Sequence, residues 1–319
     1  MRQPRILHAP RNICNISWVL AQEQREAGYV SHVMKHDDDS IESDADFNLK
    51  VHRYTRWSTR YLIYLMFAVR AALRYDIFIF HTGVTLLPYA RELPVLKALG
   101  KKIYFYFHGR DIRPAGLPDS IRYADHYFVS TPDLLEFAPG ASWLPQAIDP
   151  RRYPEARPAG IAGDPLRILH GINADTEEKR QRKGTHTILA AVKRLQQKGY
   201  RVEPCLSVSR SHDEFVAELI RADIVVDQLV LGWYGVIAIE AMLLGKPVLV
   251  YIRNDLKKYL PEGCPLIPTD PGRLENDLEQ LIQARDFARH AREGPAFVAR
   301  HHFPRAIMEK MHAVIFNGE

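Results

Sequence analysis

Short apolar runs alternate with longer amphipathic stretches along the whole chain. In the first half, runs rich in β-branched and aromatic residues predict strands, and the stretches between them have helical spacing. The predicted strands cover residues 5–8, 30–34, 76–81, 102–108 and 126–130, and the predicted helices cover 17–27, 59–74 and 91–99. Strands that alternate with helices are typical of βαβ units, so this pattern predicts a parallel sheet covered by helices.

The second half repeats the pattern after a segment rich in proline and glycine at 154–165, which predicts a linker. The strands predicted beyond it cover 167–170, 202–208, 224–227 and 247–251, and the helices 185–197, 211–221, 236–244 and 305–316. We therefore expect an α/β protein of two Rossmann-like, doubly wound domains, residues 1–157 and 158–300, with a C-terminal helix within 301–319. Ligands of such sheets bind at the carboxyl ends of the strands.

The composition is that of an ordinary globular protein. The chain has 319 residues, which is enough for about two domains. Its cysteines, Cys14, Cys205 and Cys264, are too few and too widely spaced for a disulfide framework or a zinc site. No apolar stretch of signal-peptide length follows the first residues. We expect a cytoplasmic protein, either free or at the inner face of the membrane.

Positive charge is concentrated in one part of the chain. The net charge is +5, and residues 47–75 contain six lysines and arginines but no acidic residue. One interpretation is a crossover helix buried against the sheet, with its arginines directed outward. The other is a peripheral surface, residues 50–75, that contacts anionic lipid or a phosphate-bearing acceptor. Nucleic acid is disfavoured, because the chain has no zinc finger, RNP-type strand or recognisable helix-turn-helix.

The segment 232–248 carries the most specific pattern. A predicted strand ends at Asp227, a loop with two glycines follows, and a helix begins near Gly235 with Glu240 in its second turn. Free N–H groups at a helix start bind anions, and glycine lets a phosphate approach the backbone. A carboxylate farther along can accept hydrogen bonds from vicinal hydroxyls such as those of ribose. In the alternative interpretation, Glu240 caps a neighbouring group and Gly235 only makes the turn.

This segment resembles the donor-site signature of the retaining GT-B glycosyltransferases of family 4. That signature is a glutamate, seven residues, a second glutamate and then Ala-Met-x-x-Gly-x-Pro-Val, and residues 240–248 match its second part. The resemblance implies that Glu240 holds the nucleotide ribose, and that backbone amides at Tyr234, Gly235 and Val236 contact the diphosphate or sugar. Gly232 replaces the first glutamate, which in the family contacts the transferred sugar, and Asp227 is the nearest acid that can substitute.

A second similarity lies at 170–185. The family places an arginine shortly before a Lys-Gly pair, and both cations bind the donor diphosphate. Lys183 matches the lysine, and Arg180 or Arg182 the arginine; Asn173 precedes them in the same segment. Charge-assisted hydrogen bonds from these side chains suit a leaving diphosphate. The alternative is a solvated basic loop.

A third similarity follows the predicted strand 102–108. The family carries His-Gly-x-Asp-x-Arg at this place, and here His108 and Asp111 occupy the matching positions. A histidine and an aspartate at the end of a strand can orient an acceptor hydroxyl or hydrogen-bond the transferred sugar, so both are candidate catalytic residues. The glycine-rich loop that many members have after the first strand is missing from 9–17, where Asn12, Asn15 or Ser17 can donate instead.

The resemblance implies a GT-B fold with an acceptor-side first domain, a donor-binding second domain and a last helix that packs back on the first. It implies a metal-independent hexosyltransferase that moves a sugar from a UDP- or GDP-linked donor to an acceptor sugar or lipid-linked glycan, with retention, in polysaccharide or glycoconjugate synthesis. No cofactor is expected. The alternatives are a sugar-nucleotide epimerase and a non-catalytic nucleotide-binding or scaffold protein, the latter favoured by the missing glutamate.

Overall fold

The computed structural model describes residues 3–37, 44–113, 115–154, 164–172, 174–208 and 211–317. The chain forms two compact units. The N-terminal unit combines Met1–Ala147 with Pro304–Glu319, and the C-terminal unit is Ile148–Phe303. The chain therefore passes between units at 147/148 and 303/304, whereas the sequence predicted boundaries at 157/158 and 300/301.

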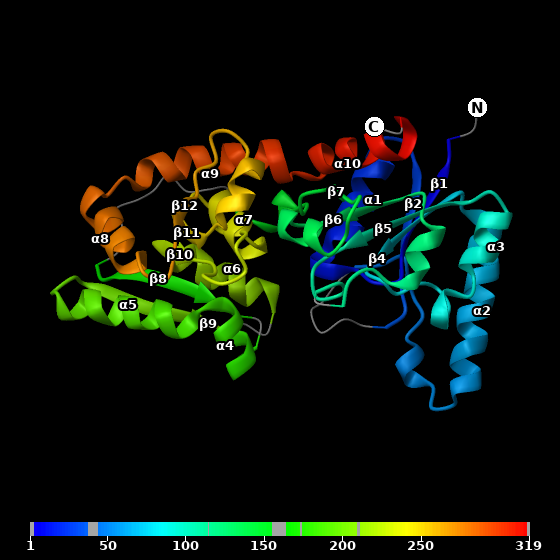
Figure 1. Ribbon diagram of the computed structural model, residues 1–319, viewed down its shortest axis with the longest axis horizontal. Helices are drawn as coiled ribbons and strands as arrows, with labels where there is room; N and C mark the ends of the chain where they lie inside the picture. Colours follow the sequence, from blue (N-terminus) through cyan, green and yellow to red (C-terminus); the bar gives the residue numbers. More distant parts are fainter. Residues whose placement is uncertain are drawn as a thin grey trace. The chain divides into compact units, whose positions relative to one another are not determined.

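The N-terminal unit contains a seven-stranded parallel sheet of order β3-β2-β1-β4-β5-β6-β7 (Figure 1). Order reverses between β1 and β4, as in doubly wound sheets. The strands are β1 (Arg5–Ala9), β2 (Val30–Lys35), β3 (Phe47–Asn48), β4 (Ile77–His81), β5 (Lys102–Phe107), β6 (His126–Val129) and β7 (Ser142–Trp143). The helices are α1 (Ile16–Glu26), α2 (Trp57–Arg74), α3 (Leu93–Ala98) and α10 (Pro304–His312).

Both faces of this sheet are covered, which is why its central strands are apolar throughout. Every residue of β4 is buried. Phe78 and Phe80 pack with residues of α2 and α3 on one face, and Ile77 and Ile79 pack with residues of α1 and α10 on the other. The last helix, α10, thus packs on α1 and contributes Ile307 to the core of the N-terminal unit.

The C-terminal unit contains a five-stranded parallel sheet of order β12-β11-β10-β8-β9. The predicted α/β class with two doubly wound units is confirmed, and the predicted elements differ from the observed ones mainly at their ends. The strands are β8 (Leu166–Gly171), β9 (Val202–Ser207), β10 (Ile224–Val226), β11 (Val248–Tyr251) and β12 (Ile267–Thr269). The helices are α4 (Glu177–Lys183), α5 (Thr185–Gln197), α6 (His212–Arg221), α7 (Val236–Leu243), α8 (Leu274–Ala284) and α9 (Phe287–His302).

Helix α2 differs from the predicted buried crossover helix. Only Ala68 and Ala71 of this helix are fully buried, whereas Leu62, Met66 and Leu73 are exposed. The prediction of a crossover helix packed against the sheet therefore holds for one face only, which also includes the partly buried Tyr64 and Phe67, and the other apolar residues are left exposed. Among the described residues, no helix is both long and apolar enough to span a bilayer.

A row of histidines runs through the interior of the N-terminal unit. His8 on β1 and His81 on β4 are fully buried, and His8 Nδ1 lies 2.9 Å from His81 Nε2. His81 Nδ1 lies 3.2 Å from His108 Nε2, and His8 Nε2 lies 2.9 Å from Gln24 Oε1. The Gln24 side-chain amide in turn lies 3.2 Å from His312 Nε2 on α10. This histidine row connects the end of β5 with the C-terminal helix.

Burial keeps these histidines neutral, because an imidazolium loses its hydration inside the unit. It lowers the pKa of His8, His108 and His312 to about 4, and that of His81 well below its usual value. The histidine row is therefore a set of neutral hydrogen-bonding groups at physiological pH.

We expect acid to destabilise the protein through these residues. Between pH 6.5 and 4 the unfolded chain binds protons that the native chain does not, so the free energy of unfolding falls as pH falls. Each such histidine contributes roughly 1.4 kcal/mol per pH unit in this range. Urea unfolding at pH 7, 6 and 5 measures the effect, and a constant or rising stability toward pH 5 would contradict it. His312→Asn should reduce the slope.

Candidate functional site

The loop between β10 and α7, together with α7 itself, carries four of the seven predicted donor-site residues. The side chain of Gln228 holds the loop, because its oxygen accepts the N–H groups of Val230 and Leu231 at 2.9 and 2.6 Å. The loop ends at Gly235, the residue immediately before α7. These contacts fix the backbone that leads into the helix.

A buried carboxylate lies at the start of α7. Asp227 is fully buried, and its Oδ2 accepts the N–H of Gly235 at 2.7 Å. The other oxygen, Oδ1, accepts a hydrogen bond from Lys183 Nζ at 3.0 Å. The structure thus brings Lys183 and Gly235 together around Asp227, and an ammonium and a helix-start N–H hold one anion between them.

Neither the backbone nor the surroundings of Gly235 require glycine within the chain itself. Its φ of −104° is open to any residue. A Cβ at this position would lie 3.4 Å from Asp227 Oδ2 and 4.0 Å from Lys183 Nζ, which are ordinary contact distances. A close approach of a phosphate to this backbone therefore stays a prediction.

Lys183 is positioned by the junction of α4 and α5. Helix α4 ends at Lys183, and Gly184 follows in the left-handed region with φ +76°. A Cβ at Gly184 would lie 3.0 Å from Leu229 Cβ, and the Leu229 N–H donates to the Lys183 carbonyl at 3.1 Å. The lysine side chain is 21% exposed, and its ammonium is anchored on the fully buried Asp227.

Glu240 forms a second polar cluster on the same helix. The residue is buried, and its Oε1 accepts hydrogen bonds from the Tyr153 hydroxyl at 2.6 Å and from His212 Nε2 at 2.9 Å. The Tyr153 hydroxyl oxygen also lies 2.9 Å from His212 Nε2. Glu240 therefore has partners within the chain, which agrees with the interpretation that it caps neighbouring groups and leaves a ribose role untested.

Other predicted donor-site residues have different surroundings. Arg180 lies in α4, and its guanidinium forms hydrogen bonds of 2.5 and 2.9 Å to the exposed Asp175. Asn173 lies outside the described residues.

Tyr234 is buried with its hydroxyl 3.1 Å from His302 Nε2, and burial raises its pKa well above the usual value. The buried Tyr234 side chain packs within the unit, which leaves only the backbone amide of this residue for the predicted donor contact. Val236 is the first residue of α7.

Gly232, at the position of the missing glutamate, is held in a conformation that favours glycine. Its φ is +83°, and a Cβ there would lie only 2.8 Å from Arg253 Cβ. Its carbonyl accepts the Arg253 N–H at 3.0 Å. A glutamate does not fit here without a shift of the backbone, so this loop differs in conformation as well as in side chain. Asp227, the nearest acid, already accepts hydrogen bonds from Lys183 and the Gly235 N–H, and its role as a substitute stays a prediction.

In the N-terminal unit, Asp111 closes the turn that follows β5. Its Oδ1 accepts the N–H of Gly109 at 2.6 Å, and both carboxylate oxygens accept the N–H of His108 at 3.1–3.2 Å. Gly109 makes this turn with φ +122°. Asp111 therefore orients the backbone of His108, and its contacts are those of a positioning residue.

The histidine row also fixes which nitrogen of His108 carries its proton. The Gln24 side-chain oxygen can only accept, so the proton of His8 is on Nε2 and its Nδ1 accepts a hydrogen bond from His81 Nε2. The Nδ1 of His81 is then unprotonated and accepts a hydrogen bond from His108 Nε2. The Ser31 hydroxyl donates to the same Gln24 oxygen at 2.7 Å, which supports this orientation of the amide. His108 Nδ1 is left with an unshared lone pair, and among the described residues it has no partner.

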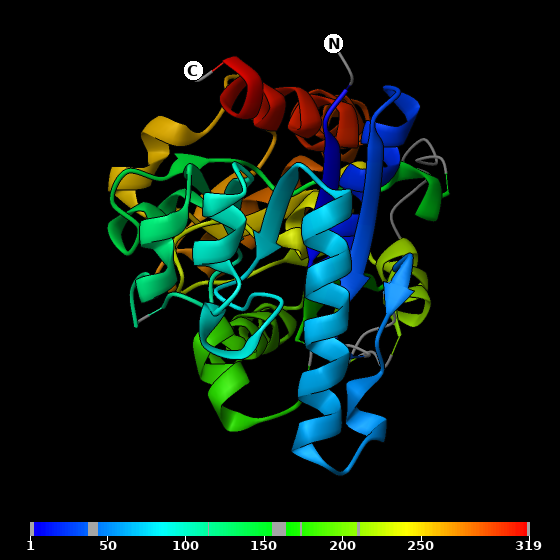
Figure 2. The same ribbon diagram turned by 90° about the vertical axis from the view of Figure 1, so that its right-hand side faces the viewer.

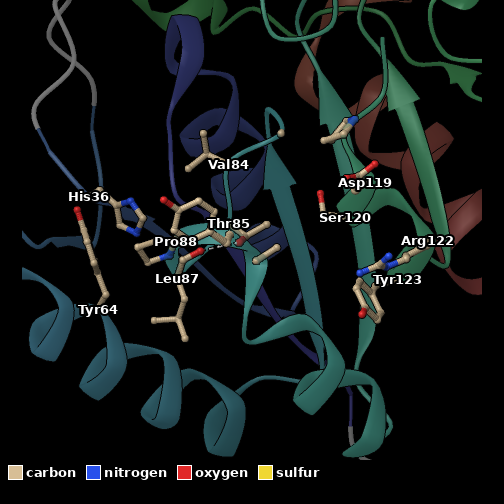
Figure 3. Close-up of a pocket in the computed structure, with 14 residues that line it drawn as sticks. His36, Tyr64, Val84, Thr85, Leu87, Pro88, Asp119, Ser120, Arg122 and Tyr123 are labelled. Atoms are coloured by element: carbon tan, nitrogen blue, oxygen red, sulfur yellow. Dashed lines mark hydrogen bonds between the residues drawn. The ribbon is translucent and has the colours of Figure 1, made fainter. Parts of the chain in front are cut away.

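A pocket that the sequence analysis did not predict lies in the N-terminal unit (Figure 3). It has a volume of about 580 Å³ and follows the carboxyl ends of β2 and β4. His36 and Tyr64 form one side, Arg122 and Tyr123 the other, and Thr85 lies between them (Figure 3). The pocket combines residues from four segments that are far apart in the sequence, so no local pattern predicts it.

The loop at this pocket has an unusual backbone. Thr82, Tyr89 and Ala90 have φ of +87°, +61° and +54°, and Tyr89 is 88% exposed. Left-handed residues other than glycine persist where the surroundings hold them, and they cluster at binding loops. The buried Glu92 holds this loop, because its carboxylate accepts the N–H groups of Leu86 and Leu87 at 2.7 and 3.2 Å.

In sequence, the chain matches no protein-family model and resembles none of the curated proteins. Its structure is similar to that of sucrose-phosphate synthase from Thermosynechococcus elongatus, with a TM-score of 0.64 and 15% identity over 100% of both chains. It is also similar to HepE from Anabaena in complex with UDP and glucose, with a TM-score of 0.65 and 13% identity over 99% of this chain and 100% of HepE.

A UDP-N-acetylglucosamine 2-epimerase is similar as well, with a TM-score of 0.57 and 14% identity over 100% of this chain and 98% of the epimerase. These similarities extend over nearly the whole of each chain. Together with the two doubly wound units, they show that this protein has the GT-B fold found in glycosyltransferases.

Proposed function

We propose that the protein transfers a sugar from a UDP- or GDP-linked donor to an acceptor hydroxyl, with retention at the anomeric carbon. The observation that carries this proposal is the anion held at the start of α7. Lys183 Nζ and the Gly235 N–H both bind Asp227, and they are the two kinds of donor that a phosphate oxygen needs. Glu240 follows on the same helix, and ribose is expected to bind there.

In the proposed reaction, the bound diphosphate competes with Asp227 for these donors. The Lys183 ammonium has three N–H groups, and one of them binds Asp227, so the others are available to phosphate. As the sugar–phosphate bond breaks, charge grows on the leaving diphosphate, and a fixed ammonium and amide stabilise it without reorganisation. The resemblance to retaining enzymes supports proton transfer from the acceptor to the leaving phosphate. No metal is included in this proposal.

We assign the acceptor to the N-terminal unit. His108 Nδ1 is a buried acceptor without a partner among the described residues, and in this proposal a hydroxyl of the sugar or acceptor reaches it and donates to it, with Asp111 and His81 as positioning residues. The pocket in that unit combines the rings of Tyr64 and Tyr123 with polar groups, as in carbohydrate sites where rings stack on sugars. An acceptor sugar or lipid-linked glycan, in polysaccharide or glycoconjugate synthesis, fits this chemistry.

A non-catalytic nucleotide-binding protein is the second candidate, and the geometry of Gly232 favours it. The glutamate that contacts the transferred sugar in related enzymes has no place in this loop. An epimerase is a further alternative, because one of the similar structures has that activity. Calorimetry with UDP- and GDP-sugars, followed by assays of transfer, slow donor hydrolysis and epimerisation, separates the three. Binding without any turnover would contradict the transferase proposal.

Removal of the Lys183 ammonium should weaken nucleotide diphosphate binding. We expect Lys183→Ala to cost about 1.5–3 kcal/mol, the usual contribution of a charged hydrogen bond. Calorimetric titration with UDP and GDP measures it. Lys193→Ala is the matched control, because Lys193 is an exposed lysine on the neighbouring helix α5 and should bind nucleotide as the wild type does. Equal affinities of Lys183→Ala and wild type would contradict the assigned diphosphate site.

The ribose assignment has its own test. The amide oxygen of Glu240→Gln can still accept from Tyr153 and His212, so the fold should be preserved. Loss of the carboxylate should weaken the binding of ribonucleotides by about 1.5–3 kcal/mol, and that of their 2′-deoxy forms by less. Titration of the preferred nucleotide in both forms measures the difference. Equal losses for the two forms would remove Glu240 from the ribose site.

A further inference from the structure

Helix α2 presents large apolar side chains to solvent. The exposed fractions are 63% for Trp57, 55% for Leu62, 58% for Met66, 52% for Val69 and 81% for Leu73. From Leu62 onward these residues are spaced three or four apart, so they form one stripe along the helix. We call this set, together with Leu65, the outer stripe.

The outer stripe is distinct from the face that α2 packs on the sheet. Ala68 and Ala71 are the buried residues of the helix, and Tyr64 and Phe67 pack partly against the same core. A helix on the surface of a soluble unit ordinarily has one apolar face, directed to the core. Here a second one is exposed, and contiguous apolar surface of this kind marks an interaction site.

The surroundings of the outer stripe are positively charged. Five arginines, at positions 53, 56, 60, 70 and 74, accompany the helix, and residues 47–75 contain no acid. None of these arginines forms an ion pair with a carboxylate in the part of the chain that the structure describes. Arg70 and Arg74 lie on the flank between the outer stripe and the packed face, as the helical spacing requires. The charge is therefore available to an anionic partner.

The position of the helix leaves this surface accessible within the N-terminal unit. The N-terminal half of α2 extends beyond the strands of the sheet (Figure 2). Trp57 and Tyr61 stack at that end with ring centroids 5.2 Å apart, and Tyr54 is 43% exposed nearby. Aromatic rings beside a basic apolar helix are typical of segments that lie at a membrane–water interface.

We propose that the outer stripe docks the protein on an anionic lipid bilayer, with α2 parallel to the surface and its arginines at the lipid phosphates. The charge distribution favours lipid over a second copy of the chain, because a symmetric pair of α2 helices would bring arginines against arginines with no acid between them. This inference stands on exposure and charge, and it does not depend on the sugar-transfer proposal.

Vesicle co-sedimentation tests the docking surface. We expect the wild-type protein to bind vesicles of phosphatidylcholine with phosphatidylglycerol at least about tenfold more than vesicles of phosphatidylcholine alone, and the difference to shrink at high salt. Met66→Ser/Leu73→Ser and Arg70→Gln/Arg74→Gln should each lower binding about tenfold. Val95→Ser on α3 combined with Leu99→Ser just after it is the matched control, because it removes two exposed apolar side chains outside the stripe.

The outcomes separate this inference from the proposed function. Absence of wild-type binding to anionic vesicles, or equal binding by all variants, would overturn the docking surface. A concentration-dependent dimer that Met66→Ser/Leu73→Ser abolishes, without vesicle binding, would assign the stripe to a second copy and also overturn it. UDP and GDP affinities, measured on the same variants, should equal those of the wild type, and they test the donor site independently.

Discussion

The buried Asp227 carboxylate is the interaction on which the candidate donor site depends. It joins the end of α4, through Lys183, to the start of α7, through the Gly235 N–H. A fully buried carboxylate is stable only when its charge is paired and hydrogen-bonded, so these two donors are held close to it. In the proposed donor site, these groups are thus oriented before a diphosphate arrives.

The departure from the family signature at Gly232 has a structural counterpart. A left-handed backbone and the nearby Arg253 exclude a side chain there. Contacts that related enzymes make to the sugar through a glutamate must come from other groups if transfer occurs here. Glu240, by contrast, matches the signature and is held by hydrogen bonds from Tyr153 and His212.

The N-terminal unit combines a rigid interior with an exposed second apolar surface. Its interior contains neutral histidines whose hydrogen bonds fix one another, from Gln24 to His108. Its surface contains the outer stripe and a pocket whose loop includes left-handed residues. Neutral buried histidines and an exposed apolar helix are both costly to stability, which makes a functional role for each a reasonable explanation.

The sequence by itself determined the order of elements, the α/β class and the residue types of the donor loop, because periodicity and glycine placement are local properties. It did not determine which charges meet. Lys183 and Asp227 are 44 positions apart, and only folding brings them to 3.0 Å. Nor did it show that α2 leaves an apolar stripe uncovered, because its apolar residues surround much of the helix and distant segments decide which of them are buried. The pocket residues come from four segments for the same reason, so tertiary contacts alone define them.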